Sequence, residues 1–280
     1  MAEAESGQAL GQALGQAPVP AILAFGVRER ARELLRRSLP RRRCDLTLVR
    51  SQVELLAALR HGFTDAVVVD FAQPTDEHWA VAAVAREFPS IPFYALAPCR
   101  PNDAPHLARA CGEFEFADLL VEGMEDVVLR ELLLPLTFTS RFSGALRDAD
   151  QVLGLESDLQ RSVWRLVIGH GGRTVLTETI AEAVGLTREH LSRRFSVNRA
   201  PNLKRVIDLA RILAAAELAK NPGYDIPDIS KVLGFASASH LSSSSQRLVG
   251  VKSSSLARLR PGDLVDRFVK QGRSRSRAAT

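Results

Sequence analysis

The chain has 280 residues, which is enough for two ordinary domains that each bury a core of their own. Apolar residues make up 46% of it and charged residues 25%, and no apolar run approaches the ~20 residues needed to cross a bilayer. Residues 1–172 carry 18 Lys and Arg against 23 Asp and Glu, whereas residues 173–280 carry 19 against 9, a net charge of +10. This composition excludes a membrane span and indicates that the C-terminal part binds a polyanion.

The N-terminal stretch contains the repeat GQALGQALGQA and lacks the basic and apolar regions of a secretory signal. We therefore expect residues 1–18 to form a disordered tail and the protein to be cytoplasmic. The three cysteines, Cys44, Cys99 and Cys111, do not have the paired spacing of metal ligands and are typical of reduced thiols. No metal site is expected from them.

From residue 19 to residue 138, short apolar runs alternate with amphipathic stretches. The expected strands are residues 21–25, 46–49, 66–69, 92–97 and 116–121. The expected helices are residues 28–39, 52–62, 76–88, 104–111 and 125–134. Five strands that alternate with five helices predict an α/β domain with a doubly wound parallel sheet.

The rest of the chain has a helical pattern throughout. Residues 139–155 are expected to be a linker helix region, and an apolar stripe runs over residues 146–168, although Gly154 interrupts it. Residues 156–262 are expected to form an all-α domain. Residues 263–280 are expected to be a basic tail whose Lys270, Arg273, Arg275 and Arg277 add nonspecific affinity for nucleic acid, or else a solvated end.

The segment TETIAEAVGLTREHLSRRF, residues 177–195, has the pattern of a helix-turn-helix motif. Gly185 permits a left-handed turn and Thr187 is a suitable N-cap for the second helix. That helix is expected to bury Leu191 and Phe195. It would expose the side chains that can reach a major groove, namely Arg188, Glu189, Ser192 and Arg193. An ordinary corner between two helices is the alternative.

A second copy of this pattern follows at residues 226–248, IPDISKVLGFASASHLSSSSQRL, with Gly234 and Phe235 at the corner. An alanine-rich helix, DLARILAAAELA, lies between the two copies. Two such motifs joined by a rigid helix would present two recognition helices to successive major-groove segments, which lie about 34 Å apart.

Residues 156–260 resemble the DNA-binding domain of the AraC/XylS family of transcriptional regulators. The residues that carry the resemblance are IAEAVGLTREHLSRRF, ARILAAAEL with Arg211, DIPDISKVLGF, Ser239, Arg247 and Gly250-Val251. The resemblance covers over a third of the chain. It implies a DNA-binding regulator in which Ser237, Ser243 and Arg247 of the second motif join the residues of the first at the DNA.

The second motif departs from the family pattern in its recognition helix. Leu241 and Ser245 stand where phenylalanines are usual, Ser243 stands where an arginine is usual, and Ser253 replaces a proline. Loss of a buried Phe removes packing of about 3–5 kcal/mol in other proteins. We expect the second motif to fold but to read bases poorly, so that Arg247 contacts phosphate while the first motif reads most of the sequence.

The N-terminal alternation, with Asp70 at the end of the third strand, resembles the receiver domain of two-component response regulators. In that family this aspartate accepts a phosphoryl group with the help of an acidic pair, a hydroxyl residue and a lysine. The corresponding positions here are Phe25-Gly26-Val27, Ala97-Pro98 and Glu122-Gly123. Asp70 is therefore a candidate phosphoacceptor without its helpers, and a module for docking, dimerisation or sensing is the favoured interpretation.

No catalytic set or cofactor motif is recognisable, so the chain is not expected to be an enzyme. Arginines at residues 36, 37, 41, 42 and 43 either bind an anion or form a solvated turn. The sequence thus predicts a regulator that binds double-stranded promoter DNA, with RNA polymerase and a second copy as further candidate partners. The alternatives are a phosphorylation-driven response regulator and an interaction protein that has lost specific DNA reading.

Overall fold

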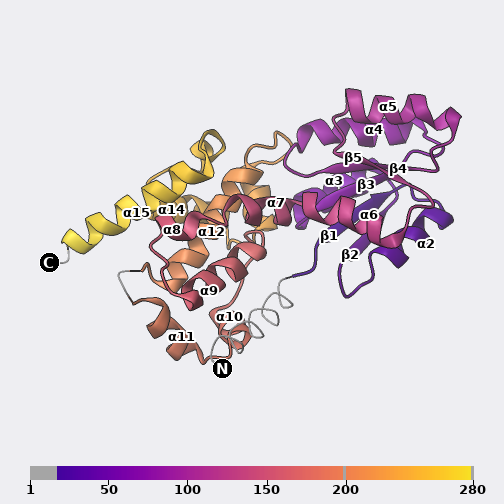
Figure 1. The fold of residues 1–280 in the computed structure, drawn as a ribbon. Helices are drawn as coiled ribbons and strands as arrows, with labels where there is room; N and C mark the ends of the chain where they lie inside the picture. Colours follow the sequence, from indigo (N-terminus) through magenta and orange to yellow (C-terminus); the bar gives the residue numbers. More distant parts are fainter. Residues whose placement is uncertain (1–17, 198–199, 279–280) are drawn as a thin grey trace. The chain divides into compact units, whose positions relative to one another are not determined.

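The computed structural model describes residues 18–197 and 200–278. The expected disordered tail lies outside the described residues, apart from Pro18. The chain divides into two compact units. The sheet unit comprises Val19–Arg141 and Lys220–Asp228, and the helical unit comprises Phe142–Ala219 and the chain from Ile229 onward. The elements of both units are labelled in Figure 1.

The sheet unit contains five parallel strands in the order β2-β1-β3-β4-β5. Their bounds are β1 (Ala21–Phe25), β2 (Asp45–Val49), β3 (Ala66–Asp70), β4 (Phe93–Ala97) and β5 (Asp118–Val121). Every residue of β3 and β4 is buried, as expected for central strands covered on both faces. This strand order is that of a doubly wound fold, so the predicted fold class is confirmed.

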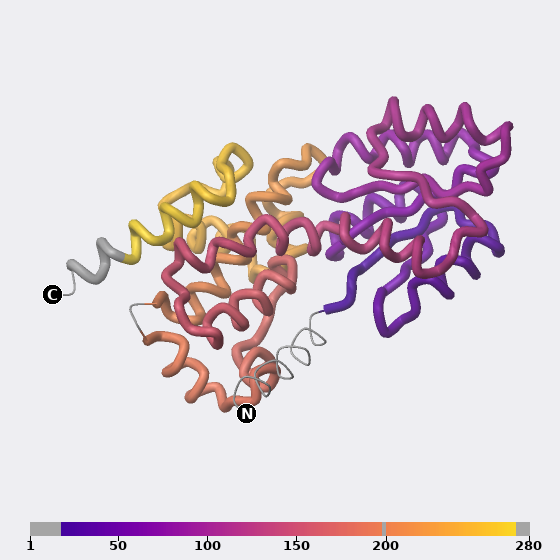
Figure 2. The backbone as a smooth tube through the Cα atoms, in the orientation of Figure 1, coloured from indigo at the N-terminus to yellow at the C-terminus, as the bar shows by residue number. Residues whose placement is uncertain are grey.

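Helices follow each strand and cover both faces of the sheet (Figure 1; the chain path is traced in Figure 2). Their bounds are α2 (Glu29–Ser38), α3 (Gln52–His61), α4 (Asp76–Val84), η1 (Ala85–Glu87), η2 (Pro101–Asp103), α5 (Ala104–Glu113), α6 (Asp126–Leu133) and η3 (Leu134–Leu136). Apolar residues of α2 and α6 pack with inward-facing residues of the strands in one core on one face. Helices α3, α4 and α5 cover the other face.

The sheet unit also includes a segment that lies far away in the sequence, Lys220–Asp228. The hydroxyl of Tyr224 donates to the carbonyl of Leu59 at 3.0 Å, and its ring meets that of Phe88 edge to face. The side chain of Asn221 accepts from the backbone N–H of Ser90 at 2.8 Å. Burial raises the pKa of the Tyr224 phenol. These contacts make the segment an integral part of the sheet unit, whereas the sequence analysis had placed it in the all-α domain.

The helical unit is arranged around α12, most of whose residues are buried. Its elements are α7 (Phe138–Ala145, which begins in the sheet unit), α8 (Ala149–Val152), α9 (Asp158–Gly169), α10 (Thr177–Ala183), α11 (Arg188–Phe195), α12 (Leu203–Leu218), α13 (Ile226–Val232, which begins in the sheet unit), α14 (Ala238–Val249), η4 (Ser253–Arg258) and α15 (Pro261–Ala278). Trp164 of α9 is fully buried and donates to the carbonyl of Leu146 at 2.9 Å.

Two parts of the helical unit differ from the sequence expectation. The apolar stripe over residues 146–168 is not one helix, because Gly154 adopts a φ of 67° and separates α8 from α9. The expected basic tail is helix α15, because Leu264, Val265 and Phe268 form an apolar stripe that is buried. The side chains of Arg273, Arg275 and Arg277 lie outside the described residues. None of the helices described has the length and apolar character that a bilayer span requires.

Replacement of Gly223 by Ala should destabilise the sheet unit by about 1–3 kcal/mol, because a Cβ there would overlap the buried ring of Phe88. The matched control is Gly112→Ala in α5, where a Cβ meets nothing within 4 Å and Ala should stabilise the helix by about 0.5–1 kcal/mol. Urea unfolding followed by ¹⁹F NMR of 5-fluorotryptophan distinguishes the units, since Trp79 lies in one and Trp164 in the other. Equal Trp79 midpoints for both variants would contradict this packing.

Candidate nucleic-acid interface and the Asp70 centre

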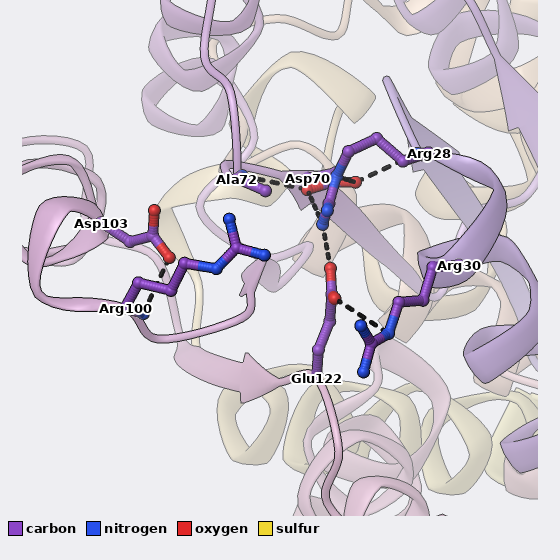
Figure 3. A network of polar contacts seen from close by, with 7 residues as sticks. All are labelled: Arg28, Arg30, Asp70, Ala72, Arg100, Asp103 and Glu122. Carbon is purple, nitrogen blue, oxygen red and sulfur yellow. Dashed lines mark hydrogen bonds and ion pairs between the residues drawn. The ribbon is translucent and has the colours of Figure 1, made fainter.

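Asp70 lies at the carboxyl edge of the sheet, with its side chain only 1% exposed. Its Oδ2 accepts hydrogen bonds from the backbone N of Arg28 at 3.1 Å and from Arg28 Nε at 2.8 Å. Its Oδ1 accepts from Arg28 Nη2 at 3.0 Å and from the backbone N of Ala72 at 3.0 Å (Figure 3). Each oxygen therefore accepts two hydrogen bonds, which uses the lone pairs that a carboxylate offers.

Arg28 follows β1 and connects Asp70 to Glu122, which follows β5 directly. Its Nη2 also donates to Oε1 of Glu122, whose side chain is 3% exposed, and Arg30 Nε lies 3.8 Å from the other carboxylate oxygen (Figure 3). The loops after β1, β3 and β5 are thus joined by one guanidinium between two buried carboxylates. A buried pair of like charges requires such a cation.

The loops around Asp70 carry other residues than those that the receiver resemblance implies for phosphoryl transfer. The chain has Phe25-Gly26-Val27 after β1, Ala97-Pro98 after β4 and Glu122-Gly123 after β5, as the sequence indicated. No group of three or more His, Cys, Asp and Glu side chains in the described residues is arranged to hold a metal ion. Arg28 occupies both oxygens of Asp70, and the sequence analysis did not anticipate this residue.

His78 of α4 packs against Phe25 and Gly26, at the carboxyl end of β1. Its Nδ1 lies 2.9 Å from Oγ1 of Thr75, and its ring meets Phe25 edge to face with centroids 5.0 Å apart. Burial lowers the pKa of His78, and the carboxylates of Asp70 and Glu77 partly oppose that effect. A Cβ at Gly26, whose φ is 64°, would overlap the imidazole. The imidazole is thus packed against the turn after β1, which leads into Arg28.

The first helix-turn-helix motif consists of α10 and α11. Gly185 has a φ of 67°, and Oγ1 of Thr187 accepts from the backbone N of His190 at 3.3 Å, as predicted for the corner and the N-cap. Leu191 and Phe195 are fully buried, which confirms the expected packing face of α11. The remaining positions of the helix therefore define its outer face.

Most of the predicted contact residues of α11 lie on this outer face. Glu189 and Arg193 are exposed, and Ser192 is half-buried. The guanidinium of Arg188 is also exposed and forms an ion pair with Glu178 of α10 at 3.0 Å. Such an exposed pair is worth no more than about 1 kcal/mol, so a phosphate can displace Glu178 at little cost.

The second motif consists of α13 and α14, with Gly234 at φ 67° between them. Arg211 of α12 fixes this corner. Its guanidinium donates to the carbonyl of Leu233 at 3.0 Å and lies 3.9 Å from the centroid of the Phe235 ring. Burial lowers the pKa of Arg211, and the carboxylate of Asp208 partly compensates. Arg211 is therefore a structural residue of the corner.

The serines of α14 have separate structural roles. Ser245 is fully buried, and its hydroxyl donates to the carbonyl of Val251 at 2.6 Å. Ser244 is buried as well. Ser243 is exposed and its hydroxyl donates to the carbonyl of His240 at 3.1 Å, while Ser237 is the N-cap that accepts from the backbone N of His240 at 3.0 Å. Buried Leu241 and a hydrogen-bonded Ser245 thus occupy the positions where the family has phenylalanine.

The predicted phosphate contact of the second motif, Arg247, lies on the outer face of α14. Its guanidinium is 55% exposed and 3.6 Å from the carboxylate of Asp208. Two of the predicted contact residues, Ser237 and Ser243, already use part of their hydrogen-bonding capacity within the helix. The second recognition helix therefore offers fewer charged groups than α11, which carries three arginines.

Residues 180–258 match a family model described as a helix-turn-helix domain. This segment is an AraC-type helix-turn-helix domain. The protein is accordingly a DNA-binding regulator, and the family found is regulatory in character. A search of curated proteins finds no match.

Among solved structures, the chain is similar to full-length FixJ from B. japonicum. The sequence identity is 18%, the match covers 68% of this chain and 95% of that chain, and the TM-score is 0.34. A structural similarity this low supports no conclusion about the fold beyond the strand order already described. The receiver-like character of the sheet unit therefore rests on its own β2-β1-β3-β4-β5 topology.

The structure exposes further residues on the outer faces of the AraC-type domain that were not among the predicted DNA contacts. His190 and Arg194 are exposed on α11, and Ser239 and Gln246 are exposed on α14. Helical periodicity could have indicated Gln246, since it lies three residues after Ser243 and one turn after Ser242. Gln246 carries both a donor and an acceptor, which bidentate pairing with adenine uses.

Replacement of Ser245 by Ala should destabilise the helical unit by about 1 kcal/mol, because the buried carbonyl of Val251 loses its hydrogen-bond donor. Ser243→Ala on the same helix is the control, with an expected change within about 0.5 kcal/mol, because its hydroxyl is exposed and Ala is the better helix former. The measurement is the urea midpoint reported by Trp164. Equal effects of the two substitutions would argue against a structural role for the buried hydroxyl.

Arg28→Ala and Asp70→Ala should each destabilise the sheet unit by about 1.5–3 kcal/mol, since each leaves a charged partner without its hydrogen bonds. The double variant should lose less than the sum, with a coupling free energy above about 1 kcal/mol. Arg30→Ala is the control, because that side chain is 77% exposed and an exposed pair contributes less than about 1 kcal/mol. Additive effects of Arg28→Ala and Asp70→Ala, measured through Trp79, would contradict the pairing.

Proposed function

We propose that the protein is a sequence-specific transcriptional regulator in which α11 reads bases in a major groove. The observation that carries this proposal is the outer face of α11, where Arg188, Glu189 and Arg193 are exposed beside Ser192. Arginine forms bidentate hydrogen bonds with guanine, and serine bonds to either partner of a base pair. Leu191 and Phe195 hold the opposite face in the core, so the reading face is set by buried packing.

In this proposal α14 binds mainly the DNA backbone. Arg247, Ser237 and Ser243 contact phosphates, and Gln246 is the side chain of α14 best suited to a base, since an amide can pair with adenine in two places. Support comes from the exposure of these residues and from the hydroxyl bonds that Ser237 and Ser243 already make. The first motif would then contribute most of the sequence specificity.

The sheet unit acts in this proposal as a docking, dimerisation or sensing module that is not phosphorylated. Its support is the state of Asp70, whose two oxygens already accept four hydrogen bonds, three of them from Arg28. A nucleophilic carboxylate needs a free lone pair, and a phosphoryl group needs a cation that is not already committed to carboxylates. RNA polymerase and a second copy of the chain are candidate partners of this module.

The test is selection of bound sequences from a random DNA pool with the full chain, followed by titration of the recovered site. Arg193→Ala should weaken binding to that site by about 1–3 kcal/mol and relax one position of the motif. The control is Arg165→Ala, which removes an exposed arginine from α9, outside both helix-turn-helix motifs, and should change affinity far less. Addition of acetyl phosphate with Mg²⁺ should leave the wild-type affinity unchanged.

Each outcome bears on a different part of the proposal. Two recovered half-sites about one helical turn apart would show that α14 reads bases as α11 does. Failure to enrich any sequence would remove sequence-specific binding and favour an interaction protein. Tighter binding after acetyl phosphate that disappears in Asp70→Asn would establish phosphorylation control instead.

A further inference from the structure

A cluster of arginines lies between α2 and β2 and takes no part in the Asp70 centre. Its members are exposed and fall within eight residues, namely Arg36, Arg37, Arg41, Arg42 and Arg43. Arg37 Nε lies 2.8 Å from both carboxylate oxygens of Asp126, and this pairing lowers the pKa of Asp126. In residues 18–197 and 200–278, no carboxylate comes within ion-pair distance of the other four.

The backbone of this basic turn, Pro40–Arg43, is held firmly at both ends. Leu39 is 2% exposed and Cys44 is fully buried, so the residues that flank the turn are anchored in the core. Within it, the backbone N–H groups of Arg43 and Cys44 both donate to the carbonyl of Pro40, at 2.7 and 3.1 Å. Three consecutive exposed arginines therefore extend from one fixed turn, although like charges repel.

A purely structural account explains only part of this cluster. Arg36 and Arg37 lie in the last turn of α2, where cations interact favourably with the helix dipole. Arg41, Arg42 and Arg43 lie beyond the helix, and within the part of the chain that the structure describes they make no ion pair. The sheet unit is not basic in general, because residues 28–50 hold nine of the fifteen Lys and Arg of Val19–Arg141 but only three of its seventeen Asp and Glu.

We propose that the basic turn is a second, sequence-independent contact with the phosphate backbone of DNA. Three consecutive residues span at most about 10 Å, and duplex DNA presents about six phosphates over that length of its axis. The guanidinium fork matches phosphate geometry, and its binding releases counterions. The AraC-type domain binds this same polyanion, so the proposed ligand of the turn is one that the chain already meets. This inference rests on the proposed function.

The experiment measures the affinity of the full chain for a duplex of unselected sequence at several salt concentrations. Simultaneous replacement of Arg41, Arg42 and Arg43 by Ala should reduce the slope of log K against log salt by up to about 2.7, since each phosphate contact contributes about 0.9. Affinity at low salt should fall tenfold or more. The same three positions replaced by Lys should keep most of the slope, because the charge is preserved.

A second triple variant separates local contact from overall charge. Arg50→Ala, Arg100→Ala and Arg141→Ala together remove the same charge from exposed positions elsewhere in the sheet unit and should leave the slope nearly unchanged. Equal losses in the two Ala triples would overturn the proposal, and so would a wild-type slope in the Arg41–Arg43 triple. In the latter case, sedimentation that shows self-association lost in this triple would assign the turn to an acidic protein surface. A wild-type chain that binds no duplex would overturn the proposed function as well.

Discussion

A carboxylate that is buried at the end of a parallel strand must be paired, because its desolvation is otherwise too costly. Asp70 and Glu122 meet this constraint through Arg28, which comes from the same chain and bonds to both. The guanidinium lies between the two carboxylates and satisfies both within one domain. The loops after β1, β3 and β5 are thus joined at the carboxyl edge of this sheet by an internal cation.

The sequence was sufficient wherever local patterns determine structure. Short apolar runs predicted every strand of the sheet, and Gly185 and Gly234 predicted the two corners. It was insufficient where contacts join distant residues. The Arg28–Asp70 bond spans 42 positions and the Arg28–Glu122 bond spans 94, so no local pattern indicates either. Helix α15 was missed because basic residues outnumber the short apolar stripe of Leu264, Val265 and Phe268.

The serine run also shows how composition can mislead about packing. A serine in place of a core phenylalanine suggests a cavity, yet Ser245 is fully buried and bonds to the carbonyl of Val251, so the polar group is satisfied. The serine run instead reduces the number of basic side chains that α14 can present to DNA. This helix has a single arginine, whereas α11 has three. The two helix-turn-helix motifs therefore have similar backbones, each with an N-capped recognition helix, but their recognition helices differ in the number of exposed charges.

The sheet unit is discontinuous in sequence, since Lys220–Asp228 belongs to it together with Val19–Arg141. A fragment that stops at Arg141 would leave the ring of Phe88 uncovered and the carbonyl of Leu59 without the Tyr224 hydroxyl. The sheet unit and the helical unit therefore cannot be separated by a single cut in the chain. A chimera that grafts the helix-turn-helix region onto another domain would have to omit these nine residues or supply that domain with a surface to receive them.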